Sequence, residues 1–373
     1  MTSGGQWVLV TEGSDGQSRA AVSAVQLLAE SGRRPAVTYT TSTTLAAASR
    51  YCRRRVHVPA VDVDTSGYVA SVRTELAHRP YLTVLPASDP AVLELELPGR
   101  HLVDKLEWEP RARRAGLAVP PTESFATLDA LLAQADQLPY PVVVKPNVKR
   151  TLAAHVASPR QLDRLAADIF PVLVQPYLHE PGGGILGLMW QGSLVAAAHL
   201  RYARTWPALC GTVSAATTVE PDTRLEDGLA ELLADYDGLF HVDLAGRYLL
   251  DINPRVHATL TVAHAAGLNL VGSYCDLLSG RPVAAVRAPA GHGYRWAEGD
   301  LRSVLWSLQR GRVGPRAAAA ALRPRRRTVH SLQLLNDPGP ALLRVAHDAH
   351  RIAARSSARV GRLLSRGRDR TCA

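Results

Sequence analysis

The chain has 373 residues, of which 46 % are hydrophobic, enough to build several packed layers around substantial cores. This composition argues against disorder, and no apolar run approaches the roughly 18 residues of a membrane-spanning helix. The first residues lack the basic and apolar segments of a signal peptide. The four cysteines are scattered without a CxxC pair, which argues against a disulfide framework or a zinc site. Together these features predict a soluble, cytoplasmic protein.

The formal net charge of +10 is concentrated at one end of the chain. The residues from Leu301 onward carry 16 arginines and three aspartates, which gives +13, whereas the first 300 residues sum to −3. The main body therefore gives no support to nucleic-acid binding. Lysine is rare, with three residues against 40 arginines. A compact ammonium suits phosphate, so Lys105, Lys145 and Lys149 are candidate phosphate contacts, although biased codon use explains the arginine excess equally well.

Residues 1–100 alternate short apolar runs with helical spacings. The predicted strands are Trp7–Thr11, Ala36–Thr40, Val56–Pro59 and Tyr81–Leu85, and the first predicted helix is Ser18–Ser31. Strand and helix in this order predict a parallel-sheet α/β domain with helices on both faces. Ligands bind beyond the carboxyl ends of such strands, but the loop Glu12–Gly16 has no GxGxxG or Walker A pattern. Dinucleotide binding there is not expected.

Residues 101–290 have an α+β pattern with an antiparallel sheet. A helix is predicted from Asp104 to about Ala115, and the predicted strands are Val142–Lys145, Val172–Tyr177, Ile185–Trp190 and Leu194–Leu200, with a further hairpin over Gly238–Asn253. We expect a break at Pro181–Gly184 and a hairpin turn at Gln191-Gly192. We divide this region into a small lobe at about 101–180 and a large lobe at about 181–290.

Residues 291–373 are rich in arginine and alanine and are predicted to form a helical tail. Between Ala341 and Arg366 an apolar stripe faces away from a row of arginines, as in a basic amphipathic helix. A solvated basic face on a helix packed against the body explains this pattern. Contact with an anionic membrane surface, nucleic acid or an acidic partner is the alternative, and the first of these would make the protein peripheral at the membrane.

Two side chains on one predicted strand have the chemistry of magnesium ligands. Asp251 and Asn253 lie two residues apart, so both point to the same face of the strand. Carboxylate and amide oxygens are the ligands that Mg²⁺ prefers. Pro254 then ends the strand, which lets Arg255 turn over the same site.

Asp243, on the preceding strand, joins this site only if the turn between the strands has the right length. A two-residue turn at Ala245-Gly246 would put Asp243 on the face opposite Asp251. A three-residue turn over Ala245–Arg247 with a glycine bulge would bring Asp243 together with Asp251 and Asn253. We expect this odd-numbered turn.

In the order of these motifs the chain resembles the ATP-grasp superfamily, over roughly residues 7–283. The matching segments are the Trp7–Thr11 strand with its helix, Asp104-Lys105, Val142–Pro146, Gln175–Leu178, Asp243, Asp251–Arg255, Ala265–Asn269 and Gly280–Val283. Each motif is short and weak alone, but their order and spacing are specific. The resemblance implies a two-lobed ATP-grasp domain that follows the α/β domain.

The resemblance also implies a function and a set of site residues. The function is ATP-dependent ligation, in which a small-molecule carboxylate is activated as an acyl phosphate and attacked by an amine or another nucleophile. The implied cofactors are ATP and Mg²⁺ (or Mn²⁺). By position, Lys105 and Lys145 would contact the phosphates. The remaining implied contacts are Gln175, Tyr177 and Leu178 at adenine, Glu180 at ribose, Asp243, Asp251 and Asn253 at the metal, and Arg255 with Arg201 at the transferring phosphoryl group.

Some positions depart from the family pattern. The loop Asn147–Leu152 has no glycine, although such loops usually cover the phosphates with backbone amides. Lys149 and Arg150 would have to replace those amides with charge. Arg201 has an alternative reading as a surface arginine in an arginine-rich chain. Three functions therefore stay open: an active ligase, a degenerate ATP-grasp protein that binds nucleotide or partners without ligation, and a peripheral membrane or scaffold protein acting through its basic helix.

Overall fold

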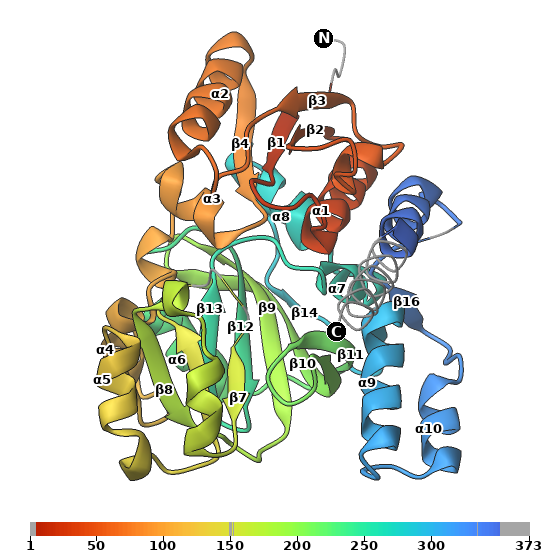
Figure 1. Cartoon of the computed structure of the whole chain (residues 1–373). Coiled ribbons are helices and arrows are strands. Elements are labelled where there is room, and N and C mark those ends of the chain that lie inside the picture. The colour runs from red at the N-terminus through yellow and green to blue at the C-terminus, as the bar shows by residue number, and fades with distance from the viewer. Residues whose placement is uncertain (1–4, 149–150, 152, 334, 351–373) are drawn as a thin grey trace, which may run out of the picture.

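The computed structural model describes residues 5–148, 151, 153–333 and 335–350 (Figure 1). The N-terminal domain is a parallel sheet with strand order β3-β2-β1-β4. Its elements are β1 (Trp7–Thr11), α1 (Arg19–Glu30), β2 (Arg34–Tyr39), β3 (Arg54–His57), α2 (Thr65–His78), β4 (Tyr81–Pro86) and α3 (Asp89–Glu94). Successive residues of β1 face opposite sides of the sheet. Val8 and Val10 therefore pack in the core that includes α1, and Leu9 packs in the core that includes α2.

The small lobe is an antiparallel sheet with strand order β5-β8-β6-β7. Its elements are α4 (Lys105–Arg114), β5 (Glu123–Phe125), α5 (Leu128–Ala133), β6 (Val142–Pro146), β7 (Ala154–Val156) and β8 (Val172–Pro176). The sheet has its own small core, in which Val142 and Val144 pack against Leu131 of α5. Alternation along β6 then leaves Val143 and Lys145 on the other face, toward the large lobe.

The large lobe is built on an eight-stranded sheet, in which β15 and β16 form one end. Its elements are β9 (Gly182–Trp190), β10 (Ser193–Trp206), β11 (Thr212–Val219), α6 (Thr223–Leu232), β12 (Gly238–Ala245), β13 (Tyr248–Asn253), α7 (Leu260–Ala265), α8 (Leu270–Leu278), β14 (Val286–Arg287), β15 (Gly293–Arg295) and β16 (Thr328–His330). The strand order is β13-β12-β9-β10-β11-β15-β16, and β14 pairs with β10. Figure 1 shows the N-terminal domain above the two lobes, with the C-terminal helices on the right.

One of two expectations about this sheet needs correction. The run Pro181–Gly184 is not a break, because Gly182, Gly183 and Gly184 are the first residues of β9. All three pair with β12, and Gly183 and Gly184 also pair with β10. The hairpin turn at Gln191-Gly192 is confirmed, since both residues have positive φ angles and Trp190 pairs with Ser193. Paired glycines make a strand here because large side chains from neighbouring strands occupy the space above them.

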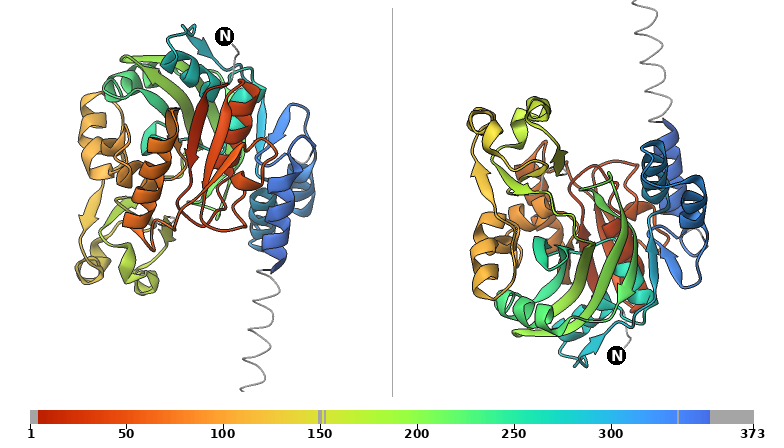
Figure 2. Two further views of the ribbon diagram at one scale, coloured as in Figure 1. Left: turned by 90° about the horizontal axis from the view of Figure 1, so that it is seen from above. Right: turned by 90° about the horizontal axis from the view of Figure 1, so that it is seen from below.

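The C-terminal part is not a purely helical tail. Residues 293–295 and 328–330 form β15 and β16 and complete the large sheet, and between them lie α9 (Ala297–Gln309) and α10 (Pro315–Leu322). The helix over residues 338–350 begins at Asp337, whose carboxylate accepts hydrogen bonds from Gln26 and Ser49 of the N-terminal domain at 3.0 and 2.6 Å. Figure 2 shows the C-terminal helices, in blue, along one side of the molecule in both views.

The predicted basic amphipathic helix falls only partly within the described residues. Its portion from residue 341 to 350 is helical, and residues 351–366 lie outside the described part of the chain. Arg344 in this portion is bound to Glu298 of α9 at 3.1 Å, so it packs against the body. Leu342 and Val345 are exposed. Among the described helices, none combines the length and hydrophobicity needed to span a membrane.

Candidate active-site cleft

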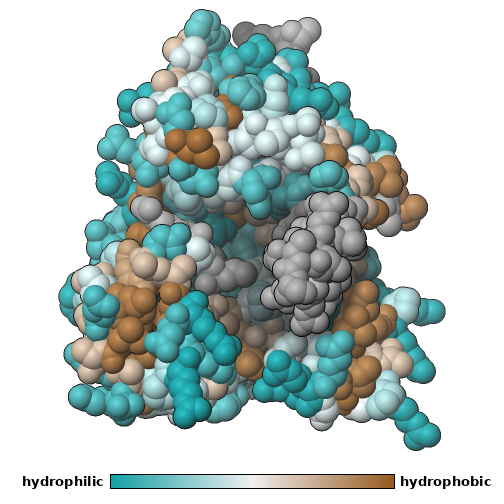
Figure 3. Space-filling model, viewed as in Figure 1, coloured by the Kyte–Doolittle hydropathy of each residue, from teal (hydrophilic) through white to brown (hydrophobic). Residues whose placement is uncertain are grey.

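A cleft of about 770 Å³ lies where the N-terminal domain, both lobes and α9 meet. Its walls include Ser18 and Asp89 from the N-terminal domain, Lys145 from the small lobe, Asp251 from the large lobe and Trp306 from α9. Figure 3 shows the corresponding face hollowed between the upper domain and the two lower lobes. The site residues that the resemblance implies line this cleft, except Arg201 and Asn253.

Two buried lysines approach the same hairpin from different elements. Lys105 is the first residue of α4 after its N-cap Asp104, and its Nζ lies 2.9 Å from Asp251 Oδ1. Lys145, near the end of β6, donates from Nζ to the backbone carbonyl of Leu250 at 2.7 Å. The two ammonium groups therefore converge on consecutive residues of β13. This arrangement places two cations beside one carboxylate in a largely water-excluded setting.

The environments of these lysines move their pKa values in opposite directions. Burial alone would lower the pKa of Lys105, but the attraction of Asp251 and other carboxylates outweighs burial and raises it. Burial, reinforced by repulsion from Lys105, lowers the pKa of Lys145 to about 8. Nearby carboxylates therefore compensate the burial of the Lys145 charge less than that of Lys105, and a bound anion would stabilise the protonated form of Lys145.

The hairpin between β12 and β13 brings Asp243 and Asp251 together in a way that differs from our expectation. The predicted three-residue turn is wrong, because Ala245 pairs with Tyr248 around a two-residue turn. An extra residue, Leu250, is instead inserted within β13, so that Asp243 pairs directly with Asp251. The bulge shifts the register by one residue and restores both carboxylates to one face. The carbonyl of the bulged residue is the acceptor for Lys145.

Asp243 is held by a tyrosine that crosses from β10. The hydroxyl of Tyr202 donates to Asp243 Oδ1 at 2.8 Å and lies 3.0 Å from Nε2 of the fully buried His241. Since the hydroxyl proton is directed to the carboxylate, His241 Nε2 is the donor in the second bond. The paired glycines of β9 make room for this ring, because a Cβ at Gly184 would lie 2.3 Å from the tyrosine oxygen.

Arg255 is oriented before any ligand binds. Its Nε donates to the buried Asp89 carboxylate, and its Nη2 donates to Asn253 Oδ1 at 2.6 Å. Asn253 itself is 1 % exposed, and its amide also donates to the carbonyl of His241 at 3.4 Å. Asn253 therefore stands behind the arginine, whereas Arg255 lines the cleft.

The end of β8 and the segment that follows it, from which adenine contacts were expected, border the cleft. Gln175 is 4 % exposed and donates from Nε2 to Thr122 and Glu109 at 2.8 and 3.2 Å, which fixes its side chain. Burial raises the pKa of Glu109. Tyr177, Leu178 and Glu180 also line the cleft.

Arg201 does not join the other predicted site residues. It is exposed, and the residues that line the cleft from β10 begin at Tyr202. Neighbouring strand residues point to opposite faces, so a side chain beside Tyr202 is directed away from it. Arg204, further along β10, lines the cleft and is held by the fully buried Asp300 of α9 at 2.5 Å. Lys149 and Arg150 lie outside the described residues.

Among the cleft residues, the sequence analysis assigned no ligand contact to Asp89, Tyr202, Arg204 or Arg19. For Asp89 a signal existed, because it follows β4 at the carboxyl edge of the parallel sheet and begins α3 after the N-cap Ser88. The other three depend on strand register and on contacts between distant segments. No local pattern identifies them.

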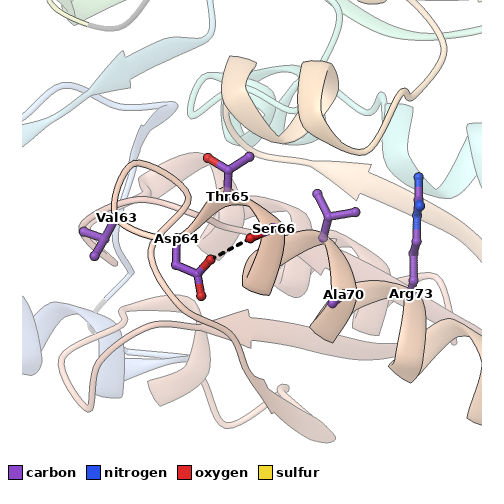
Figure 4. Close-up of a pocket in the computed structure, with 7 residues that line it drawn as sticks. Val63, Asp64, Thr65, Ser66, Ala70 and Arg73 are labelled. Atoms are coloured by element: carbon purple, nitrogen blue, oxygen red, sulfur yellow. Dashed lines mark hydrogen bonds between the residues drawn. The ribbon is translucent and has the colours of Figure 1, made fainter.

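A second hollow lies on the outside of the N-terminal domain and is shown in Figure 4. It is lined by Val63, Asp64, Thr65, Ser66, Val69, Ala70 and Arg73. Asp64 accepts a hydrogen bond from Gly67 N at 2.8 Å and so caps α2, and Arg73 lies 3.8 Å from Glu96. These polar groups are exposed and serve local structure. The cleft between the N-terminal domain and the two lobes is therefore the candidate site.

Comparisons with known proteins identify the fold. No family model matches the chain, and no curated protein matches its sequence. Solved structures do match. An L-amino acid ligase from Bacillus licheniformis has a TM-score of 0.57 at 15 % identity, covering 73 % of this chain and 74 % of the ligase. The N5-carboxyaminoimidazole synthase from Aspergillus clavatus, a complex with ADP and 5-aminoimidazole ribonucleotide, has 0.58 at 12 %, covering 78 % and 81 %.

A third similar structure is the biotin carboxylase domain of the 2-oxoglutarate carboxylase from Hydrogenobacter thermophilus, in complex with MgADP, ADP and bicarbonate. Its TM-score is 0.59 at 12 % identity, covering 77 % of this chain and 73 % of that one. All three are ATP-grasp enzymes. The chain therefore has the ATP-grasp fold, with a parallel-sheet domain preceding the two lobes, as the sequence motifs predicted.

Proposed function

We propose that this chain is a magnesium-dependent ligase that uses ATP to activate a small-molecule carboxylate as an acyl phosphate, which an amine or another nucleophile then attacks. One observation carries the proposal. Lys105, Lys145, Asp243, Asp251 and Arg255, from four separate elements, converge on one cleft between the two lobes. The similar structures with bound ADP support a nucleotide in the equivalent cleft.

The carboxylates fit a magnesium ion that is shared with nucleotide phosphates. Asp243 and Asp251 pair directly across the hairpin, and such side chains have Cβ atoms roughly 5 Å apart. No cluster of three or more histidine, cysteine or acidic residues occurs in the described part of the chain, which suits Mg²⁺ with its few carboxylates and remaining phosphate or water ligands. When bound, the ion would neutralise phosphate charge and polarise the transferring group.

The chain's own cations would provide the rest of the electrostatic stabilisation. Lys145 and Lys105 would contact the phosphates, where their charge offsets the negative charge of the transferring group. Arg255 is fixed by Asp89 and Asn253, so its planar guanidinium is oriented before the reaction and loses little freedom on binding. Tyr177 and Leu178 would border the adenine, and Glu180 the ribose.

Nucleotide binding and turnover test this function separately. A thermal shift with MgATP tests binding, and release of ADP or AMP with a panel of acids and amines tests ligation. Asp251→Ala should abolish the magnesium-dependent shift, whereas Asp163→Ala, an exposed aspartate of the small lobe, should leave it unchanged. An unchanged shift in Asp251→Ala would falsify the metal assignment. Binding without turnover would favour a degenerate protein, for which the glycine-free loop after Lys145 is the supporting feature.

A further inference from the structure

Four arginines line the cleft, namely Arg19, Arg204, Arg255 and the exposed Arg312, and they differ in their charge partners. Arg255 is bound to Asp89, and Arg204 is bound to Asp300, so the fold itself neutralises both. Arg19, at the first position of α1, also lines the cleft. Among the described residues, no carboxylate lies within ion-pair distance of Arg19.

Aromatic side chains hold the guanidinium of Arg19 in place of a carboxylate. Its Nη1 donates to the hydroxyl of Tyr294 at 3.0 Å, and its Cζ lies 3.8 Å from the centroid of the Trp296 ring. Tyr294 lies on β15 and Trp296 follows that strand as the N-cap of α9, so the junction of the two elements carries both contacts. Stacking and a single hydroxyl fix the plane of the guanidinium but leave its charge uncompensated.

The nearest acidic side chain is committed elsewhere. Glu298 attracts Arg19 electrostatically, but its carboxylate is bound by Arg302 at 2.7 Å and by Arg344 at 3.1 Å. Arg344 also donates to Gln17, another cleft residue, at 3.2 Å. Asp348 also binds Arg344, at 3.2 Å, so three arginines (Arg19, Arg302 and Arg344) face two carboxylates and this end of the cleft carries a net positive charge.

Arg19 also lies close to the catalytic end of the cleft. Its backbone carbonyl accepts from the hydroxyl of Ser23, one helical turn or about 5.4 Å along α1, and that hydroxyl also lies 3.4 Å from the carbonyl of Ala258. Ala258 lines the cleft and follows Arg255 by three residues. A ligand on Arg19 would therefore sit beside the large-lobe segment that carries Arg255.

We propose that Arg19, held by Tyr294 and Trp296, binds an anionic group, a carboxylate or a phosphate, on the nucleophile that completes the ligation. This inference rests on the proposed function for the identity of the nucleophile. The nucleophile is then an amine that carries a second, negatively charged group, and Arg19 sets specificity by binding that group. The site joins the first helix to the C-terminal part, so it exists only when both are in place.

Isothermal titration of the full chain, saturated with MgADP, tests the inference without requiring turnover. The probes are two pairs that share an amine and differ in one anionic group: L-alanine with L-alaninamide, and O-phosphoethanolamine with ethanolamine. At least one anionic member should bind the wild type at least tenfold more tightly than its neutral partner. The pair that shows this preference distinguishes a carboxylate from a phosphate ligand.

Arg19→Gln should weaken the anionic probe about 10- to 100-fold, as expected for loss of a charge-assisted hydrogen bond, and leave the neutral probe unchanged. Arg19→Lys, which keeps the charge and the aliphatic stem, should lose less affinity and serves if the first variant does not fold. Arg316→Gln, an exposed arginine of α10 that does not line the cleft, is the matched control and should bind like the wild type.

Two results would overturn the inference: a wild type that binds neither anionic probe more tightly than its neutral partner, or an Arg19 variant that retains the preference. ADP release with the same amines is measured in parallel. Anion binding at Arg19 without any turnover would remove the ligase function and leave the anion site standing. If MgADP does not bind, the titrations are performed without nucleotide and are judged by the same outcomes.

Discussion

Replacing Tyr202 with phenylalanine tests how the cleft positions Asp243. The change removes a hydroxyl that donates to Asp243 at 2.8 Å and accepts from His241, and it leaves the ring in its space above Gly184. A hydrogen bond to a charged group contributes about 1.5–3 kcal/mol, and the fully buried His241 would lose an acceptor as well. We therefore expect the free energy of unfolding to fall by about 2–3 kcal/mol without nucleotide.

The same change should weaken magnesium-dependent nucleotide binding, because a ligand carboxylate without its hydrogen bond is less well oriented. Loss of such outer partners typically costs about 10- to 100-fold in metal affinity. Urea denaturation measures the first effect, and titration with MgADP and with ADP alone measures the second. We expect Tyr202→Phe to lower the affinity for MgADP and to leave the affinity for ADP alone unchanged.

Tyr140→Phe is the control for this experiment. The hydroxyl of Tyr140 is also buried, but it has no hydrogen-bond partner among the described residues. Its removal should be neutral or slightly stabilising, since no bond is lost and an unsatisfied polar group disappears. Equal effects of the two substitutions, or a Tyr202 variant with unchanged magnesium dependence, would refute the positioning role.

Three further substitutions test other parts of the structure. Burial raises the pKa of Glu12 to about 7. The contribution of Glu12 to stability is therefore present below about pH 4.5 and is lost as the pH rises through 7. In urea denaturation, Glu12→Gln should raise the free energy of unfolding above that of the wild type by up to about 3 kcal/mol at pH 8, and by little at pH 4. Asp300→Asn leaves two partly buried arginines without their fully buried carboxylate and should cost about 3–5 kcal/mol by the same assay. Gly184→Ala should cost about 1–3 kcal/mol because its Cβ meets Tyr202, whereas Gly314→Ala, with open space around it, should be tolerated.

Much of the architecture could be predicted because its signals are local. The strand Trp7–Thr11 matches β1, and the predicted helix Ser18–Ser31 matches α1 within one residue at each end. Apolar periodicity and capping residues determine these elements, and both are visible in short windows. Lys105 and Lys145 were found for a related reason, since lysine is rare in this chain and each follows a recognisable motif.

The predictions that were wrong depend on the register of the strands. The turn after Ala245 has two residues, and the bulge that aligns the carboxylates lies inside β13 at Leu250, where no glycine marks it. Sequence patterns place bulges best at glycines, so this one was invisible. Arg201 failed for the same reason, because a shift of one residue along β10 decides which side chain enters the cleft. The glycines that accommodate Tyr202 were predicted to break the chain. That prediction was wrong because Tyr202, which occupies the space next to them, is distant in sequence.

Ion pairs in the cleft join separate parts of the chain, so we expect that none of these parts forms the site alone. Arg255 of the large lobe is bound to Asp89 of the N-terminal domain, and Arg204 is bound to Asp300 of α9. A fragment restricted to residues 101–290 would keep both arginines and lose both carboxylates. Removing one partner of a buried pair typically costs about 3–5 kcal/mol. We therefore expect this fragment to be unstable and to lack the magnesium-dependent thermal shift with ATP of the full chain, and a fragment that folds and binds MgATP normally would show that these pairs are dispensable.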